Sequence, residues 1–152
     1  MILSCLHQGT RDLHERRQRR QDDHEDNANH DKNQGWLEKC GTHVYSRNKW
    51  TRRYFVLTCN ELHYFKRGDN DDLFGTKRGG FELATIQAAI PKHDVPDREY
   101  CIEITTVDDV SILVLDAHDS TNQRSWCEAI SQGVHLARRK LKKRRNTLTG
   151  DF

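Results

Sequence analysis

The chain has 152 residues, of which 32% are charged and 34% are hydrophobic, and its formal net charge at pH 7 is +2. This length corresponds to one domain with tails, and no run approaches the roughly 20 apolar residues that cross a bilayer. The five cysteines are scattered without a CxxC pair, a pattern that disfavours a zinc site or a disulfide framework and suits reduced thiols in the cytosol.

Three regions differ in composition. Residues 1–34 hold six basic and seven acidic side chains, and residues 7–34 contain one leucine, one alanine and no aromatic residue. Such a segment cannot bury enough surface to offset its ordering entropy, so a disordered N-terminal tail is expected there. The folded domain is expected over residues 35–137, and residues 138–152 are expected to form a basic tail that continues the last helix.

Charge is unevenly distributed within the expected domain. Residues 35–80 carry nine basic and five acidic side chains, whereas residues 81–137 carry three basic and ten acidic ones. A fold that gathers the first strands around one opening would be electrically polarised. Such polarity can orient a protein on an anionic surface.

From Gly35 onward the chain consists of short segments separated by turn-rich pieces. Tyr100, Ile102 and Ile104, for example, alternate with other residues, as is typical of a half-buried strand. Seven strands at this spacing predict a mainly β fold, an antiparallel sandwich or barrel. The predicted strands are 35–41, 50–58, 61–67, 79–84, 85–90, 99–106 and 110–117.

The last regular element is predicted to be a helix. Ser120 and Gln123 have the spacing of a capping box, which indicates that the helix begins near Ser120. An apolar stripe with a 3.6-residue period follows, and we expect it to pack on the strands. The stripe comprises Trp126, Ala129, Ile130, Gly133, Val134, Ala137 and Leu141.

The segment that follows Lys49 begins charged and ends apolar. Because side chains alternate across a strand, Lys49, Thr51 and Arg53 share one face with Phe55 and Leu57. The two apolar residues are expected in the core, so Arg53, Thr51 and Lys49 should climb from the core toward an open rim.

The neighbouring segments repeat this arrangement. Leu37 shares a face with Lys39, and Leu62 shares a face with Tyr64. Three strands would thus each place an apolar residue inward and a polar or basic residue nearer the rim. Converging cations and hydroxyl groups are what an inositol phosphate, with its several dianionic groups, requires.

The order of these segments resembles a pleckstrin homology (PH) domain over roughly residues 34–137. The resemblance implies a PH-like seven-stranded antiparallel β-sandwich or barrel capped by one C-terminal α-helix. It also implies a binding function without catalysis. It rests on Gly35-Trp36-Leu37-Glu38-Lys39, on Trp50 to Leu57, on Leu62-His63-Tyr64-Phe65-Lys66 and on Trp126 in the final helix.

The resemblance also assigns roles to particular residues. It implies that Lys39 and Arg53 contact phosphates, that the Tyr64 hydroxyl donates a hydrogen bond, and that Arg78 closes the pocket. The family pattern has lysine or arginine directly after the tryptophan of the second strand, where this chain has Thr51. Lys49 lies on the same face two residues earlier and compensates in part, so we expect modest affinity and loose discrimination among phosphoinositides.

The end of the predicted helix is strongly basic. Seven cations in eight residues are expected to contact an acidic membrane as a second site, and a nuclear import signal is the competing use of such a run. These cations are Arg138, Arg139, Lys140, Lys142, Lys143, Arg144 and Arg145.

Together these features predict a non-enzymatic module that recognises phosphoinositide headgroups and is cytoplasmic and peripherally membrane-associated. The alternative is a protein-binding adaptor of the same fold with little or no lipid binding. Nucleic-acid binding is disfavoured because the central region is acidic overall and the tails lack aromatic residues for base stacking. No cofactor or metal is expected, and no serine or cysteine lies in a nucleophile motif.

Overall fold

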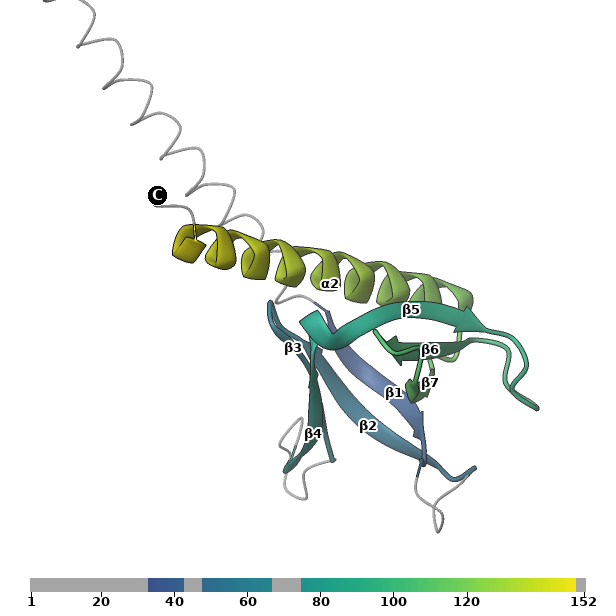
Figure 1. Cartoon of the computed structure of the whole chain (residues 1–152). Helices are drawn as coiled ribbons and strands as arrows, with labels where there is room; N and C mark the ends of the chain where they lie inside the picture. Colours follow the sequence, from purple (N-terminus) through teal and green to yellow (C-terminus); the bar gives the residue numbers. More distant parts are fainter. Residues whose placement is uncertain (1–32, 43–47, 67–74, 150–152) are drawn as a thin grey trace, which may run out of the picture.

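The computed structural model describes residues 33–42, 48–66 and 75–149 (Figure 1). Residues 1–32, on which most of the predicted disordered tail falls, lie outside this part of the chain. The described elements are β1 (Gln34–Cys40), β2 (Trp50–Leu57), β3 (Glu61–Phe65), β4 (Lys77–Glu82), the 3₁₀ turn η1 (Leu83–Thr85), β5 (Ile86–Lys92), β6 (Cys101–Thr106), β7 (Ser111–Asp116) and the helix α2 (Ser120–Thr149).

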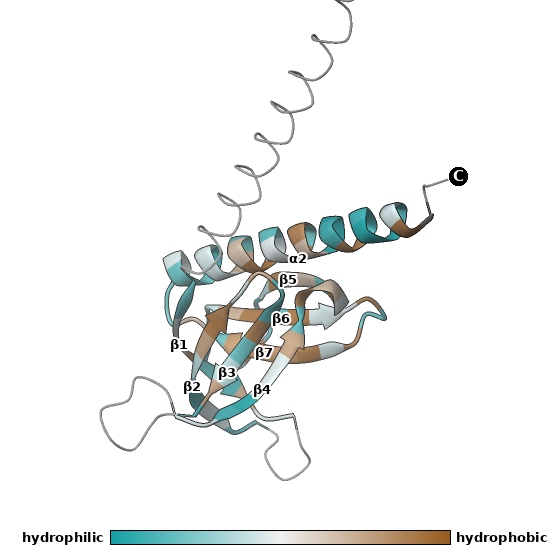
Figure 2. Ribbon diagram, turned by 90° about the vertical axis from the view of Figure 1, so that its left-hand side faces the viewer, coloured by the Kyte–Doolittle hydropathy of each residue, from teal (hydrophilic) through white to brown (hydrophobic). Residues whose placement is uncertain are grey.

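The strands form one antiparallel sheet in the order β4-β3-β2-β1-β7-β6-β5. The sheet curves around a common core, and α2 crosses one end of it (Figures 1 and 2). This arrangement confirms the predicted seven-stranded β-sandwich with a C-terminal helical cap. None of the described helices is long and apolar enough to cross a bilayer.

The core follows from the alternation of apolar residues along each strand. Leu37 in β1, Phe55 and Leu57 in β2, and Leu62 in β3 are all fully buried. On the other side of the core, Ile102, Ile104, Leu113 and Leu115 of β6 and β7 are also fully buried. The inward faces of β1, β2 and β3 are therefore those that the sequence pattern predicted.

Several predicted strand limits change where turns interrupt the ladder. The residues predicted to join two strands near position 84 instead form η1, in which the Thr85 hydroxyl donates to the Glu82 carbonyl oxygen at 2.7 Å. Leu83 of η1 is buried in the core, so the turn is held by packing. β6 begins at Cys101, two residues later than predicted, because residues 93–100 form the connection from β5.

The helix α2 begins with a different cap from the one predicted. The Asp119 carboxylate accepts a hydrogen bond from the Asn122 backbone amide at 2.7 Å, as an N-cap residue does. The Gln123 side chain, predicted to complete a capping box with Ser120, is buried and donates to the Cys101 carbonyl oxygen at 2.8 Å. A tertiary hydrogen bond to β6 thus replaces the predicted local one.

The apolar stripe of α2 packs on the sheet as predicted over most of its length. Trp126, Ile130, Val134 and Ala137 are all buried in the core cluster. Leu141, predicted to belong to the same packed stripe, is 43% exposed. Leu141 borders a cavity that Asn60, Glu82 and Ala84 also line, so it faces the domain without the close packing that buries the earlier residues of the stripe.

Trp126 is the residue through which α2 closes the sandwich. Its ring lies edge-on to Phe55 with a centroid distance of 6.5 Å, and only 6% of the residue is exposed. Gly35 of β1 approaches the same ring, since a Cβ there would lie 3.8 Å from it. The indole therefore connects the helix to both β1 and β2.

We predict that Trp126→Ala lowers the free energy of unfolding by about 3–5 kcal/mol, because it leaves a large cavity between helix and sheet. Thermal or urea unfolding of the two proteins measures this difference. Replacing the exposed Leu148 by alanine provides a control in the same helix, with little expected change. A melting temperature for Trp126→Ala within a few degrees of the wild-type value would show that α2 does not close the core.

Candidate functional site

The inward face of β1 and β2 passes from core to rim within two residues. Leu37 is paired with Arg53, and Lys39 is paired with Thr51. Leu37 is buried, Arg53 and Lys39 are half-buried, and Thr51 is exposed. The pairing thus places two cations directly beyond the core, at the end of the sandwich where β1 and β3 end and β2 and β4 begin. This end is called the mouth, and it lies at the bottom of Figures 1 and 2.

Tyr64 of β3 forms the third side of the mouth. Its ring packs on Phe55, with a centroid distance of 5.5 Å, and on Phe81 of β4, at 6.4 Å. Gly79 allows this position, because a Cβ there would lie 2.5 Å from the Tyr64 hydroxyl oxygen. Glycine at position 79 is therefore a requirement of the tyrosine's placement, and the hydroxyl is held at the edge of β4.

The Lys39 ammonium group lies over Tyr64, with its Nζ atom 5.6 Å from the ring centroid. Burial, and after it the positive charge of Arg53, hold the pKa of Lys39 below its ordinary value. Both causes disfavour the charged form of Lys39 in the folded protein. The free protein therefore holds the partly desolvated ammonium group of Lys39 beside a second cation, Arg53.

No carboxylate pairs with either cation within the described residues. The Lys39 Nζ donates to the Cys40 carbonyl oxygen at 3.4 Å, and the Arg53 Nη1 donates to the Arg52 carbonyl oxygen at 3.0 Å. The ion pairs of the described segments all involve other residues. An anion at the mouth would supply the missing countercharge.

Lys49 and Arg78, the other two residues predicted for this site, lie at its exposed rim. Arg78 stands at an irregularity in the pairing of β3 with β4, opposite Tyr64 and Phe65. Neither side chain forms an ion pair or hydrogen bond with the residues that the structure describes. The structure thus brings Lys39, Arg53 and Tyr64 together, and it leaves Lys49 and Arg78 exposed at the rim.

The next arginine, Arg52, lies on the other face of the same strand. Its guanidinium group stacks over the ring of Trp36, 4.9 Å from the centroid. Trp36 in turn meets Tyr54 edge-on at 5.2 Å. Arg52 is consequently outside the mouth, although it is adjacent in sequence to Arg53.

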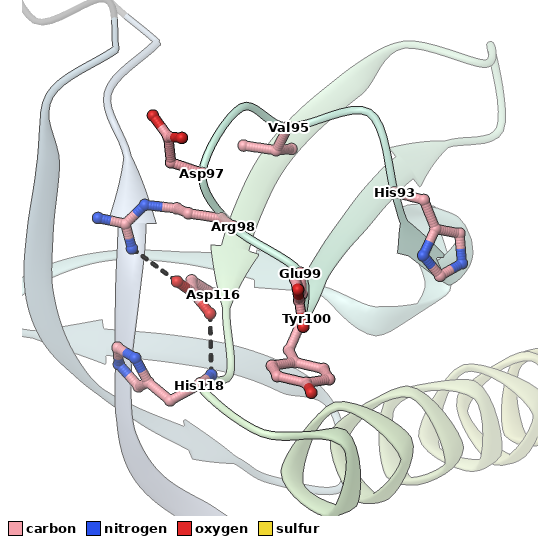
Figure 3. A pocket seen from close by; sticks show the side chains of 8 residues that line it. All are labelled: His93, Val95, Asp97, Arg98, Glu99, Tyr100, Asp116 and His118. Carbon is pink, nitrogen blue, oxygen red and sulfur yellow. Dashed lines mark hydrogen bonds and ion pairs between the residues drawn. The ribbon is translucent and has the colours of Figure 1, made fainter.

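A second charged cluster surrounds Arg98 in the connection from β5 to β6. The Arg98 Nη1 bonds to a carboxylate oxygen of Glu38 in β1 and to one of Asp116 in β7, and the guanidinium lies 4.0 Å from the ring centroid of Trp50. Asp116 also accepts from the His118 backbone amide at 2.8 Å (Figure 3). Arg98 therefore ties a loop to three strands, a role that no sequence motif indicated.

The cavity beside Arg98 has a volume of about 620 Å³ (Figure 3). Glu38, Asp116 and His118 place three potential metal-ligand atoms within 4.8 Å of one another. Arg98 already forms ion pairs with both carboxylates of this group, and its positive charge would oppose a bound cation. We assign the cluster a structural role. The cavity is lined by His93, Val95, Asp97, Arg98, Glu99, Tyr100, Asp116 and His118.

Two of the four described cysteines are poor nucleophiles. Burial raises the pKa of the Cys101 thiol to about 11, and it does the same for Cys127. Both thiols are therefore protonated at neutral pH and unreactive.

The basic end of α2 lies across the molecule from the mouth. α2 runs over the top of the sandwich in Figures 1 and 2, whereas the mouth is at the bottom. Arg138 donates to the Ile86 carbonyl oxygen at the start of β5. Lys140 and Arg144 border a cavity of about 310 Å³ that also includes Glu61 and Glu82. The segment predicted to be a second membrane contact thus lies at the opposite end of the sandwich from the mouth.

A sandwich with a helical cap and a cationic mouth is the architecture of a binding module. The family model described as "PH domain" matches residues 32–135, which is more than half of the chain. The chain therefore belongs to the PH domain family, as the sequence pattern predicted.

Solved structures agree with this assignment. The C-terminal PH domain of pleckstrin in complex with D-myo-Ins(1,2,3,5,6)P5 is 28% identical, with a TM-score of 0.53, over 68% of this chain and 94% of that one. The C-terminal PH domain of human pleckstrin is 26% identical, with a TM-score of 0.54, over 69% and 88%. The Slm1 PH domain in complex with phosphoserine shares the fold at 18% identity, with a TM-score of 0.53, over 66% and 91%. No curated protein matches the chain.

The Arg98 cluster leads to a prediction about stability. Arg98→Ala would leave the Glu38 and Asp116 carboxylates close together without their shared cation, and we expect a loss of about 2 kcal/mol, since both groups are only partly exposed. Urea unfolding measures the loss. Arg124→Ala, at an exposed position of α2, is the control. Equal losses of unfolding free energy for the two variants would mean that the ion pairs of Arg98 do not stabilise the fold.

The unpaired charge of Lys39 leads to a second prediction. Lys39→Met removes a disfavoured charge but keeps an aliphatic chain over Tyr64, so the melting temperature of the free protein should rise. Wild-type stability increases relative to the variant as the pH rises from the lowered pKa of Lys39 toward the ordinary lysine value, so the difference should narrow at alkaline pH. Differential scanning calorimetry at several pH values measures both effects.

Lys49→Met is the matched control, because Lys49 is exposed at the same rim and its replacement should leave the melting temperature unchanged. A lower melting temperature for Lys39→Met than for wild type would mean that Lys39 stabilises the free domain, contrary to this description of the mouth.

Proposed function

We propose that the mouth binds the phosphate groups of inositol lipids and so recruits the protein to membranes that contain them. The observation that carries the proposal is the pair Lys39 and Arg53, two half-buried cations on neighbouring strands without a carboxylate partner in the described residues. A polyphosphate headgroup is a dense anion that would relieve their repulsion. Binding energy would thus come from charges that are unfavourably placed in the free protein.

Each group at the mouth has a distinct chemical role in this proposal. The planar guanidinium of Arg53 donates paired hydrogen bonds to one phosphate, and the ammonium of Lys39 acts as a compact charge between phosphates. The Tyr64 hydroxyl reaches the edge of β4 because Gly79 has no side chain to block it, and it adds a neutral donor. Lys49 and Arg78 at the rim contribute solvated charges that attract the headgroup and close over it.

The comparisons support this choice of ligand. The pleckstrin C-terminal PH domain, 28% identical to this chain, has been crystallised with an inositol pentakisphosphate. Thr51, opposite Lys39 in the pairing of β1 and β2, provides a hydroxyl where the family pattern has a cation. We therefore propose moderate affinity and loose discrimination among phosphoinositides.

The matched pair Arg53 and Arg52 tests the proposal. Arg53→Ala should weaken binding to phosphoinositide liposomes by tenfold or more, because a charge-assisted hydrogen bond contributes about 1.5–3 kcal/mol. Arg52→Ala removes the same charge from the opposite face, where the guanidinium stacks on Trp36, and should have a much smaller effect. Liposome co-sedimentation measures both, and equal losses would mean that binding depends on diffuse charge alone.

Thr51→Lys is expected to increase affinity. Thr51 is exposed, so a lysine there adds a cation at the rim without burying it. Calorimetry with a soluble inositol polyphosphate should show tighter binding than for wild type, and Thr121→Lys, at an exposed threonine at the start of α2, serves as the control. Unchanged affinity of Thr51→Lys would place the binding pocket elsewhere.

A further inference from the structure

The last turns of α2 project beyond the sheet. In both views the helix continues past the strands toward its C-terminus, and hydrophilic residues dominate its final turns (Figures 1 and 2). Residues 141–148 are all exposed. Segment 138–149 of α2, called the projecting helix, is about 18 Å long at the α-helical rise of about 1.5 Å per residue.

The projecting helix carries the apolar stripe of α2 to the edge of the domain and then past it. Leu141 still borders the cavity that Asn60, Glu82 and Ala84 also line, whereas Leu148 lies beyond it. Val134 is buried, Leu141 is 43% exposed, and Leu148 is 87% exposed. These three residues follow one another at intervals of seven, so they lie along one line of the helix. The Leu148 side chain is thus almost wholly exposed to solvent. Apolar residues seven positions apart are the anchors through which a helix typically binds in an apolar groove.

Cations surround this line on every side. Arg139 and Lys143 stand two residues from Leu141 and thus about half a turn away, while Lys140 and Lys142 stand one residue away on either flank. No acidic residue occurs between Arg138 and Thr149. A flat anionic bilayer would meet one side of this helix only, whereas a groove with acidic walls would meet the leucines and the cations together.

Contacts within the domain account for only part of this charge. Arg138 is bonded to Ile86, and Lys140 and Arg144 border a cavity with two glutamates. Cations also favour a helix C-terminus, but the effect is confined to about the last turn. Arg139, Lys142 and Lys143 are exposed, and neither these contacts nor the helix dipole explains the exposed Leu148.

The position of the projecting helix also favours a partner in solution. It lies at the end of the sandwich opposite the mouth (Figures 1 and 2). A protein bound to a membrane through the mouth would therefore present this helix away from the bilayer. This orientation rests on the proposed function, but the exposed leucines and the charge pattern do not.

We infer that the projecting helix docks into the apolar groove of an acidic protein of the calcium-sensor type. Such proteins expose a flexible apolar groove with acidic surroundings when they bind calcium. Leu148 would enter the groove, with the exposed part of Leu141 at its edge, and Arg139, Lys142 and Lys143 would pair with carboxylates on its walls. Recruitment of this partner would then depend on calcium, independently of the mouth.

The test uses the full chain with calcium-loaded calmodulin as the probe, titrated by calorimetry. We expect a saturable one-to-one complex at micromolar concentrations that is lost when calcium is chelated. Leu148→Ser should weaken it by about tenfold or more, as loss of a buried anchor does. Leu148 is 87% exposed, so the variant keeps its fold. Val107→Ser, at another exposed apolar position, should leave binding unchanged.

Three results would overturn the inference. These are no complex with the probe in calcium, equal binding by wild type and Leu148→Ser, or tighter binding of the full chain to a DNA duplex or to phosphatidylserine vesicles without phosphoinositide than to the probe. The last result would assign the cations to diffuse electrostatic contact. Arg53→Ala should not affect the complex, so failure here is distinguishable from failure of the mouth.

Discussion

The structure depends on one constraint, namely that a single face of β1 and β2 must serve both the core and the mouth. Leu37 and Phe55 anchor this face in the core, and the alternation of side chains then forces Lys39 and Arg53 to point the same way. The cations cannot turn outward without pulling the apolar residues out with them. No carboxylate of the described residues pairs with these cations. The packing of the core therefore keeps two positive charges close together, where an anion can bind to both.

The remaining elements arrange the molecule around this mouth. Trp126 connects α2 to β1 and β2 at the far end of the sandwich, and Arg98 ties the β5–β6 connection to β1, β2 and β7. The result has two poles. One is the cationic mouth, and the other is the projecting helix with its exposed Leu148. We propose that they serve different partners, an inositol phosphate and an acidic groove, so that the domain could hold both at once.

Sequence patterns predicted the parts of this structure that depend on local periodicity. The seven strands, the inward face of β2 and the stripe from Trp126 to Ala137 follow from alternation and helical period. Contacts distant in sequence were not predictable, as Arg98 shows, because it is 60 residues from Glu38 and no motif connects them. Gln123 shows the reverse case. Its spacing from Ser120 predicted a local capping box, but its side chain donates a hydrogen bond to the Cys101 carbonyl oxygen of β6. The grouping of Lys39, Arg53 and Tyr64 was predictable because each continues a strand face whose apolar end was clear.

The most direct test of the central claim is the pKa of Lys39, measured by NMR titration of the lysine side chains and assigned from the spectrum of Lys39→Met. In the free protein, Lys39 should titrate below the exposed lysines, because burial and Arg53 disfavour its charge. With a saturating soluble inositol polyphosphate, its pKa should rise, since the anion stabilises the ammonium. A Lys39 that titrates with the exposed lysines and does not respond to the ligand would contradict the account.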